Sequence, residues 1–140
     1  MPDPYYKIVP VKTARTPIAE LQYSTKDRIL HITILNGAEM DLTNAKIHYE
    51  KINELTGNKK HLVLVNAANY YRIAKEAWQY ASSHDVVANR VAVAHYNSCD
   101  ANILEMKFYR STLHTAMPVE IFDTKEEALI WLRLYKSKLD

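Results

Sequence analysis

Two short apolar runs constrain the fold more than any other feature of the sequence. The first is His61-Leu-Val-Leu-Val-Asn66 and the second is Arg90-Val-Ala-Val-Ala-His-Tyr96. Neither run alternates with polar residues, which is typical of strands that are covered on both faces in a parallel sheet. Parallel neighbours need crossover connections, and these are usually helices. We therefore expect an α/β domain with helices packed on its sheet.

An antiparallel hairpin is predicted ahead of these runs. Residues 18–23 and 29–35 both place apolar side chains on one face with period two, and a polar turn at residues 24–28 separates them. Asn36-Gly37 ends the second strand, because glycine accepts positive φ without steric cost. Four of the five prolines lie in residues 1–17, so we expect an extended N-terminal arm there and a single domain over residues 18–140.

The first two helices are predicted from caps and spacing. Residues 42–56 carry apolar side chains at helical spacing between Asp41, which is suited to cap a helix start, and Gly57, a natural stop. A second helix is predicted over residues 73–82, and a short helical turn capped by Ser83 follows it.

Two more helices are predicted in the last third of the chain. Asn97 or Ser98 caps the third, which is given an apolar stripe of Ala101, Leu104 and Phe108. After a last strand at residues 119–122, the capping box Thr124-Lys-Glu-Glu127 starts a fourth helix that keeps helical spacing to the C-terminus. The predicted order is β-β-α-β-α-β-α-β-α, an N-terminal hairpin followed by parallel strands joined by helices in one mixed sheet.

Composition excludes several function classes. The chain has 140 residues and a net charge of +2 from interspersed charges of both signs, so we expect no nucleic-acid partner. One cysteine cannot form an internal disulfide, and no apolar run approaches ~20 residues, so we expect a cytoplasmic protein without a membrane span. The two glycines form no phosphate-binding loop, and the six histidines show no metal-ligand spacing. We expect no cofactor and no metal.

Four stretches carry a resemblance to a known family. They are Ile29-Leu-His-Ile-Thr-Ile34, Ala38-Glu-Met-Asp-Leu-Thr-Asn-Ala-Lys46, Leu55-Thr-Gly-Asn-Lys-Lys-His-Leu-Val-Leu-Val-Asn66 and Ile121-Phe-Asp-Thr-Lys-Glu-Glu-Ala-Leu-Ile-Trp-Leu132. With the order of elements over residues 29–134, they resemble the bacterial STAS-like domains, relatives of the anti-sigma-factor antagonists, and most closely uncharacterised stand-alone members. The resemblance implies a non-enzymatic module that binds a protein partner.

The sequence departs from the regulatory members of that family at the phosphorylation site. The resemblance implies a phosphorylated serine near the start of the helix that follows the central strand. Here Arg72-Ile-Ala-Lys-Glu-Ala77 offers no serine or threonine, and the strand ends in Asn66 where such proteins usually carry aspartate. Partner exchange controlled by a kinase is therefore not expected.

Two segments are candidates for a binding cleft. Open α/β sheets bind ligands beyond the carboxyl ends of their parallel strands, and residues 66–71 and 95–100 both follow such strands. The side chains singled out for binding a ligand or partner are Asn66, Asn69, Tyr70, Tyr71, His95, Asn97, Ser98 and Cys99. Turn and capping chemistry explains the same residue types without a ligand, and that alternative stays open.

Three function classes follow from these observations. The leading hypothesis is an interaction or regulatory domain with an unidentified protein partner that also forms a homodimer. A tyrosine-rich surface of Tyr5, Tyr6, Tyr70, Tyr71 and Trp78 is the candidate contact, since ten tyrosines stand against two phenylalanines. The second is a small-ligand carrier or sensor that uses the cleft. The third is an enzyme with Cys99 as its nucleophile and His95 nearby, for which the sequence shows no oxyanion site.

Overall fold

The computed structural model describes residues 11–113 and 117–140, apart from the side chains of residues 106, 108–110, 112 and 113. In chain order the elements are β1 (Val11–Arg15), β2 (Ala19–Ser24), β3 (Ile29–Ile34), β4 (Ala38–Met40), α1 (Leu42–Thr56), β5 (His61–Asn66), β6 (Tyr71–Ile73), α2 (Lys75–Ala81), α3 (His84–Val87), β7 (Arg90–Tyr96), α4 (Asp100–Leu113), β8 (Val119–Phe122), α5 (Lys125–Arg133) and the 3₁₀ helix η2 (Lys136–Leu139).

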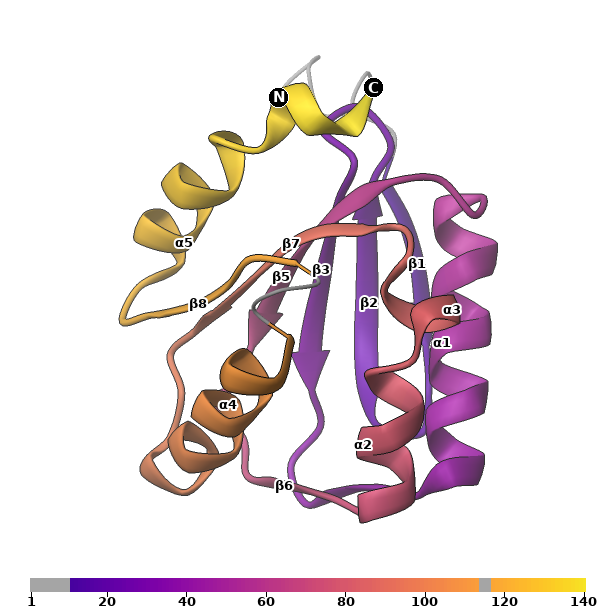
Figure 1. The fold of residues 1–140 in the computed structure, drawn as a ribbon, viewed down its shortest axis with the longest axis vertical. Helices are drawn as coiled ribbons and strands as arrows, with labels where there is room; N and C mark the ends of the chain where they lie inside the picture. The colour runs from indigo at the N-terminus through magenta and orange to yellow at the C-terminus, as the bar shows by residue number, and fades with distance from the viewer. Residues whose placement is uncertain (1–10, 114–116) are drawn as a thin grey trace, which may run out of the picture.

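The main sheet is mixed, which confirms the predicted architecture. Its strand order is β1-β2-β3-β5-β7-β8 (Figure 1). The pairs β1·β2 and β2·β3 are antiparallel, whereas β3·β5, β5·β7 and β7·β8 are parallel. The predicted N-terminal arm falls partly outside the described residues, and its described part forms the edge strand β1.

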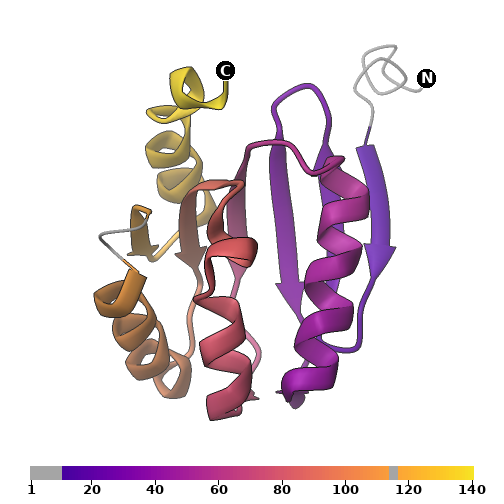
Figure 2. The same cartoon turned by 45° about the vertical axis from the view of Figure 1, so that its right-hand side comes forward.

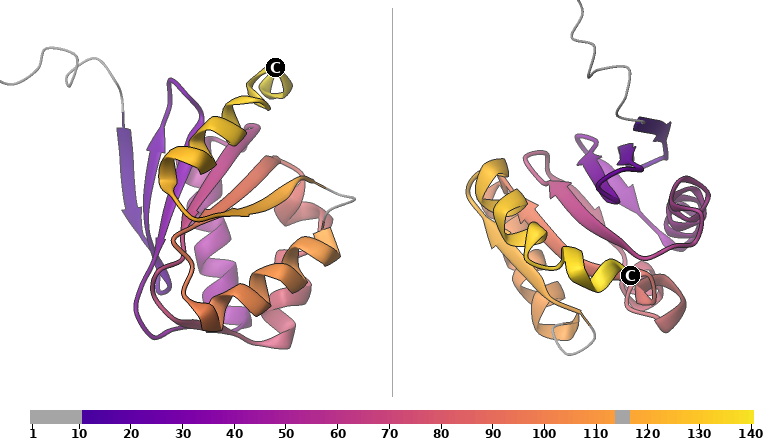
Figure 3. Two further views of the ribbon diagram at one scale, coloured as in Figure 1. Left: turned by 90° about the vertical axis from the view of Figure 1, so that its left-hand side faces the viewer. Right: turned by 90° about the horizontal axis from the view of Figure 1, so that it is seen from above.

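Helices cover both faces of this sheet. Helices α1 and α2 lie over one face (Figure 2), and α5 lies on the opposite side when the molecule is seen from above (Figure 3). The two faces carry separate cores, because alternate residues of one strand point in opposite directions. Val63 and Val65 of β5 belong to the larger core beneath α1 and α2, and Leu62 and Leu64 belong to the smaller core beneath α5.

The caps of α1 and α5 form largely as predicted. Asp41 accepts a hydrogen bond from the amide of Asn44 at 2.7 Å, and Gly57 ends α1 with a φ of 65°. At α5, Thr124 accepts from the amide of Glu127 at 3.2 Å, and its hydroxyl contacts the Glu127 carboxylate at 3.0 Å. The glutamate therefore returns to the threonine hydroxyl rather than to the backbone amide of a full capping box.

Three local predictions are corrected. The helix predicted over residues 73–82 begins at Lys75, because Tyr71–Ile73 pairs with Ala38–Met40 as a two-stranded parallel ribbon. The last helix does not continue to the C-terminus: α5 ends at Arg133, and the tighter η2 buries Leu139 in the core beneath α5.

The third correction concerns the apolar stripe of α4. Its predicted members Ala101 and Leu104 are exposed, Leu104 by 75%, and the side chain of Phe108 lies outside the description. Among the described side chains of α4, the buried one is Asn102, which is 1% exposed.

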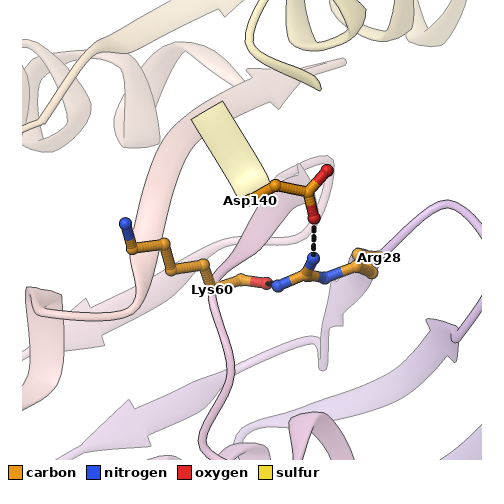
Figure 4. Close-up of polar contacts among 3 residues, drawn as sticks. All are labelled: Arg28, Lys60 and Asp140. Atoms are coloured by element: carbon orange, nitrogen blue, oxygen red, sulfur yellow. Dashed lines mark hydrogen bonds and ion pairs between the residues drawn. The ribbon is translucent and has the colours of Figure 1, made fainter. Parts of the chain in front are cut away.

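Arg28 joins three segments at one end of the sheet. Its Nε and Nη2 atoms donate hydrogen bonds to the carbonyl of Lys60 at 3.1 and 2.8 Å, and Nη1 meets the carboxylate of Asp140 at 3.2 Å (Figure 4). The turn between β2 and β3 is thereby tied to the start of β5. Because the Asp140 side chain is 94% exposed, the ion pair contributes little beside the two carbonyl contacts.

Candidate functional site

The two segments predicted to form a cleft do meet. Strands β5 and β7 are parallel neighbours, so their carboxyl ends lie together, and the Ala67 amide donates to the carbonyl of Tyr96 at 3.1 Å. The amide of Cys99 in turn approaches the carbonyl of Ala67 at 3.4 Å. The adjacency of these loops therefore follows from the pairing of β5 with β7.

Most of the predicted site residues serve this loop structure. Asn66 accepts from the amide of Ala68 at 3.2 Å, and Asn69 donates to the carbonyl of Ile34 at 2.9 Å. Asn97 is exposed with a φ of 57°, a conformation that asparagine tolerates. Ser98 and Cys99 are partly exposed and immediately precede α4.

The buried side chain of Asn102 fixes the segment after β5. Its Nδ2 donates to the carbonyls of Ala67 at 2.9 Å and Asn69 at 2.7 Å, and its Oδ1 faces the amide of Tyr71 at 3.5 Å. A buried amide that satisfies several backbone groups is costly to lose. Asn102 thereby holds the backbone on either side of Tyr70 and at Tyr71. In this arrangement the side chain of Tyr70 is 48% exposed and that of Tyr71 is 9% exposed.

The predicted tyrosine surface is therefore not one surface. Tyr5 and Tyr6 lie outside the described residues. Tyr71 is buried and Trp78 is partly buried, and both line a cavity. Among the described members Tyr70 is the most exposed.

This internal cavity lies between the sheet and helices α1 and α2, and we call it the sheet–helix cavity. Its volume is about 60 Å³, and it is partly open to solvent. Nine of its lining side chains are apolar; Ile18 lies just before β2, and the others come from the sheet, from the β4·β6 ribbon and from α2. The other five are polar or titratable: His48, Tyr49, Tyr71, Arg90 and His95. Of the eight residues predicted for a binding site, Tyr71 and His95 line this cavity and the other six do not.

A one-residue bulge directs Arg90 into the cavity. In the pairing of β5 with β7, His61 lies opposite Arg90 but Leu62 lies opposite Ala92, so Val91 is an extra residue. If the strand alternated regularly, Arg90 would lie on the α5 face together with Ala92. The bulge instead places Arg90 on the opposite face, together with His95. Bulges that redirect a side chain are over-represented beside functional sites.

Arg90 is a buried cation, and it contacts an aromatic ring. It is 7% exposed, and its Cζ atom lies 5.4 Å from the ring centroid of Tyr49. Burial raises the pKa of Tyr49, and the neighbouring charge of Arg90 partly opposes that rise. Since burying a guanidinium is costly, Arg90 is a candidate functional residue of this cavity.

Three histidines are buried beneath α1 and α2, and all are neutral near pH 7. Burial, followed by the charge of Arg90, lowers the pKa of both His48 and His95 to about 3. Burial lowers the pKa of His61 to about 4, although a hydrogen bond with the Lys59 carbonyl opposes the shift. His48, His61 and His95 are called the buried histidines below.

The ring of His48 is held by Thr16. Oγ1 of Thr16 lies 2.9 Å from Nδ1 of His48 and accepts hydrogen bonds from the amides of Ile18 and Ala19 at 3.3 and 3.1 Å. The same hydroxyl lies 3.4 Å from the carbonyl of Ala19, so its one proton is shared between that carbonyl and Nδ1 of His48 as acceptors.

A second cavity adjoins the first, and Tyr49 and Arg90 line both. It also measures about 60 Å³, and its wall includes His61 and Asp85. Nδ1 of His61 meets the Lys59 carbonyl at 2.9 Å, and its buried Nε2 has no hydrogen-bond partner among the described residues. Both cavities are large enough for ordered water.

Comparison with known proteins identifies the family. Residues 23–136 match the family described as "Domain of unknown function (DUF7793)". The chain belongs to this family. The match spans all but one of the residues that line the sheet–helix cavity, since Ile18 precedes it. No curated protein and no solved structure matches the chain.

No helix in the described part of the chain is long and apolar enough to cross a membrane. The same residues contain no group of three or more potential metal ligands.

Sequence reasoning missed the residues that make the cavity polar. His48 lies on the inner face of α1, three residues after Ala45 and four before Ile52. This helical spacing is the signal in the sequence that places His48 on the inner face. Arg90 gave no such signal, because its direction depends on a mismatch between two strands.

Proposed function

We propose that this domain is a non-enzymatic binding module that takes up a small molecule in the sheet–helix cavity. The observation that carries the proposal is the inward direction of Arg90 at the β7 bulge, into a cavity otherwise lined mainly by apolar side chains. Apolar walls with a few convergent polar groups are the usual composition of small-molecule sites. A core built for stability alone gains little from a buried guanidinium.

The cavity also has the support that a binding site needs. Asn102 holds the segment that places Tyr71 in the wall, and Thr16 holds the ring of His48. Side chains whose positions are fixed by neighbouring hydrogen bonds lose little entropy when a ligand binds. This module acts as a carrier or sensor in the cytoplasm.

Filling the cavity tests the proposal. Ala81 lines it and is 3% exposed, so Ala81→Leu places an isobutyl group in the ligand volume. We expect native mass spectrometry of the wild-type protein to show a retained small molecule, and Ala81→Leu to lose it. Ala101→Leu, at an exposed position of α4, is the matched control and should keep the molecule.

Two results would contradict the proposal. One is an added mass that persists in Ala81→Leu. The other is a wild-type protein that carries no added mass and whose melting temperature no small molecule raises in a thermal-shift screen.

A second candidate function is a STAS-like interaction domain that self-associates or binds a protein partner. The observation in its favour is Tyr70, a large side chain that is 48% exposed on a segment held by Asn102 beside the start of β6. Tyr70→Ala should weaken association in sedimentation velocity, while Leu104→Ala, on the exposed face of α4, should not. Equal sedimentation of both variants and the wild type would remove Tyr70 from the interface.

A further inference from the structure

We propose that helix α5 is the surface through which two copies of this chain associate, packed antiparallel about a twofold axis. This inference goes beyond the proposed function, because α5 covers the face of the sheet opposite the sheet–helix cavity. Seen from above, α5 lies on the outside of the molecule, across the sheet from α1 (Figure 3). The inference rests on an exposed apolar ridge, on the aromatic rings beside it and on the order of charges along the helix.

Two large apolar side chains are exposed one helical turn apart on α5. Ile130 is 64% exposed, and Leu134, the C-cap residue of the helix, is 72% exposed. Ala128 and Leu132, by contrast, are fully buried in the core beneath α5. Residues four apart lie one above the other on a helix, so Ile130 and Leu134 form a continuous ridge on the side turned away from the sheet. We call these two residues the α5 ridge.

The α5 ridge differs from the other exposed apolar side chains of the protein. Among the described residues, the other large ones are Val11, Leu42, Ile47, Tyr70 and Leu104. Leu42 and Ile47 share helix α1, but a spacing of five residues turns them about 140° apart around the helix axis. Single exposed apolar residues are ordinary on protein surfaces, whereas a contiguous apolar surface marks an interaction site.

A cluster of aromatic rings borders the α5 ridge. Trp131 and Tyr135 follow the two ridge residues in sequence, and their ring centroids lie 5.0 Å apart. The centroid of Trp131 also lies 5.7 Å from that of Phe122 on β8. All three side chains are partly exposed, so they extend the apolar surface beside the ridge. Tryptophan, tyrosine and phenylalanine are enriched at contacts between proteins.

The charges along α5 and η2 favour a second copy of the chain as the occupant. Residues 123–127 hold three acidic side chains and one lysine, a net charge of −2, whereas residues 133–138 hold three basic side chains and no acid, a net charge of +3. Antiparallel packing brings the acidic end of each copy beside the basic end of the other. A twofold contact requires a surface that is complementary to itself in this way. An anionic lipid surface would instead repel the acidic end.

The α5 ridge also selects a register for the contact. If Ile130 of one copy packs against Leu134 of the other, then Glu126 of the first is level with Lys138 of the second. Pairing Ile130 with its own copy would bring Leu134 level with Glu126, and pairing Leu134 with its own copy would bring Ile130 level with Lys138. Of these three registers, only the first matches apolar with apolar residues and acid with base.

Sedimentation velocity of the full chain between about 5 and 500 µM tests the proposal. One helix of nine residues per chain forms a small interface, so we expect a monomer–dimer equilibrium with a dissociation constant of roughly 10–100 µM. Leu134→Glu places a charge on the ridge and should weaken association at least about tenfold. Leu104→Glu, at a position of α4 that is 75% exposed, is the matched control and should associate like the wild type. Both positions are exposed, and circular dichroism checks that both variants fold.

A mixing experiment tests the antiparallel arrangement. The double variant Glu126→Lys/Glu127→Lys reverses the acidic end of the helix, and Lys136→Glu/Lys138→Glu reverses the basic end. Each variant alone should associate roughly tenfold more weakly than the wild type, because like charges then meet at both ends of the contact. An equimolar mixture of the two should recover the wild-type affinity, because each end of one variant then meets the opposite charge on the other.

The outcomes that overturn the proposal are distinct. A wild-type protein that sediments as a monomer at about 500 µM would refute it, and binding of that monomer to phosphatidylserine vesicles would assign the ridge to a lipid surface. A dimer that Leu134→Glu leaves intact and Tyr70→Ala disrupts would move the contact to Tyr70. A mixture that associates no better than its two components would refute the antiparallel arrangement. None of these readouts involves the sheet–helix cavity, so they leave the proposed function to its own test.

Discussion

Replacing Asn102 tests how the structure holds the segment that follows β5. Asn102→Ala removes two donated hydrogen bonds, at 2.9 and 2.7 Å, and leaves the carbonyl of Asn69 without its side-chain donor. The carbonyl of Ala67 keeps only the long contact from the amide of Cys99. An unsatisfied buried polar group costs about 1–3 kcal/mol, so the variant should lose roughly 2–4 kcal/mol of unfolding free energy.

Urea denaturation followed by circular dichroism measures this loss, and a melting curve provides a second readout. For a chain of this length the loss corresponds to a fall in Tm of roughly 6–12 °C. Asn44→Ala is the matched control, because the Asn44 side chain makes one solvent-exposed hydrogen bond, to the carbonyl of Glu39 at 2.9 Å. We expect the control to lose less than about 1 kcal/mol.

A third variant gives the effect a pH signature. Asn102→Asp places a carboxylate against the two carbonyls, and burial with like partial charges raises its folded pKa above the unfolded value near 3.9. The folded state then binds more protons than the unfolded state, so this variant should be relatively more stable at pH 4 than at pH 7. If Asn102→Ala were no less stable than Asn44→Ala, the assigned role of Asn102 would be wrong.

Three further outcomes are expected. The pKa values of the buried histidines are lowered in the folded state, so below pH 6.5 the unfolded state binds more protons than the folded state. Each histidine should therefore remove roughly 1.4 kcal/mol of unfolding free energy per pH unit as the pH falls toward 4. A urea midpoint that is constant from pH 7 to 5 would contradict this. Arg28→Ala should lower the unfolding free energy by about 1–2 kcal/mol, because it removes two hydrogen bonds to the Lys60 carbonyl, whereas Asp140→Asn should lower it by less than about 0.5 kcal/mol. Equal losses of the two variants in urea denaturation would refute this difference. Tyr71→Ala should lower the unfolding free energy by about 3 kcal/mol because the ring of Tyr71 is buried, while Tyr70→Ala should lower it little. A larger loss for Tyr70→Ala would show that Tyr70, and not Tyr71, is the buried ring.

The elements that sequence predicted correctly depend on local chemistry. Helix α1 has the predicted bounds because Asp41 and Gly57 act through backbone groups within a few residues of themselves. Strands β5, β7 and β8 also match residue for residue, because a short apolar run is enough to specify a strand that helices cover.

The elements that sequence missed depend on contacts between distant segments. Strands β4 and β6 have three residues each, too few to show a period, and each is a strand because the other pairs with it. In α4 an asparagine faces inward because loop carbonyls from another part of the chain satisfy it. Hydrophobic spacing gave no signal for Asn102, because its apolar neighbours Ala101 and Leu104 are exposed.

The candidate site was predicted only in part for the same reason. The rule that parallel sheets bind ligands at their carboxyl ends correctly indicated that the segments after β5 and β7 would meet. It did not anticipate a cavity beneath α1 and α2, to which α1 contributes His48 and Tyr49 and the opposite end of β7 contributes Arg90. Of the predicted residues, Tyr71 and His95 contribute to it.

The extra residue at Val91 makes the way in which β7 is paired, as well as its composition, decide where a charge is placed. A chain without Val91 would pair Arg90 with His61 and Ala92 with Leu62 in regular register, and the guanidinium would stay beneath α1 and α2. A chain that keeps residue 91 but pairs it regularly would instead carry the guanidinium to the α5 side of the sheet. In an alignment of this family, an aligned arginine therefore marks a cation under α1 and α2 only where residue 91 is either absent or held in a bulge.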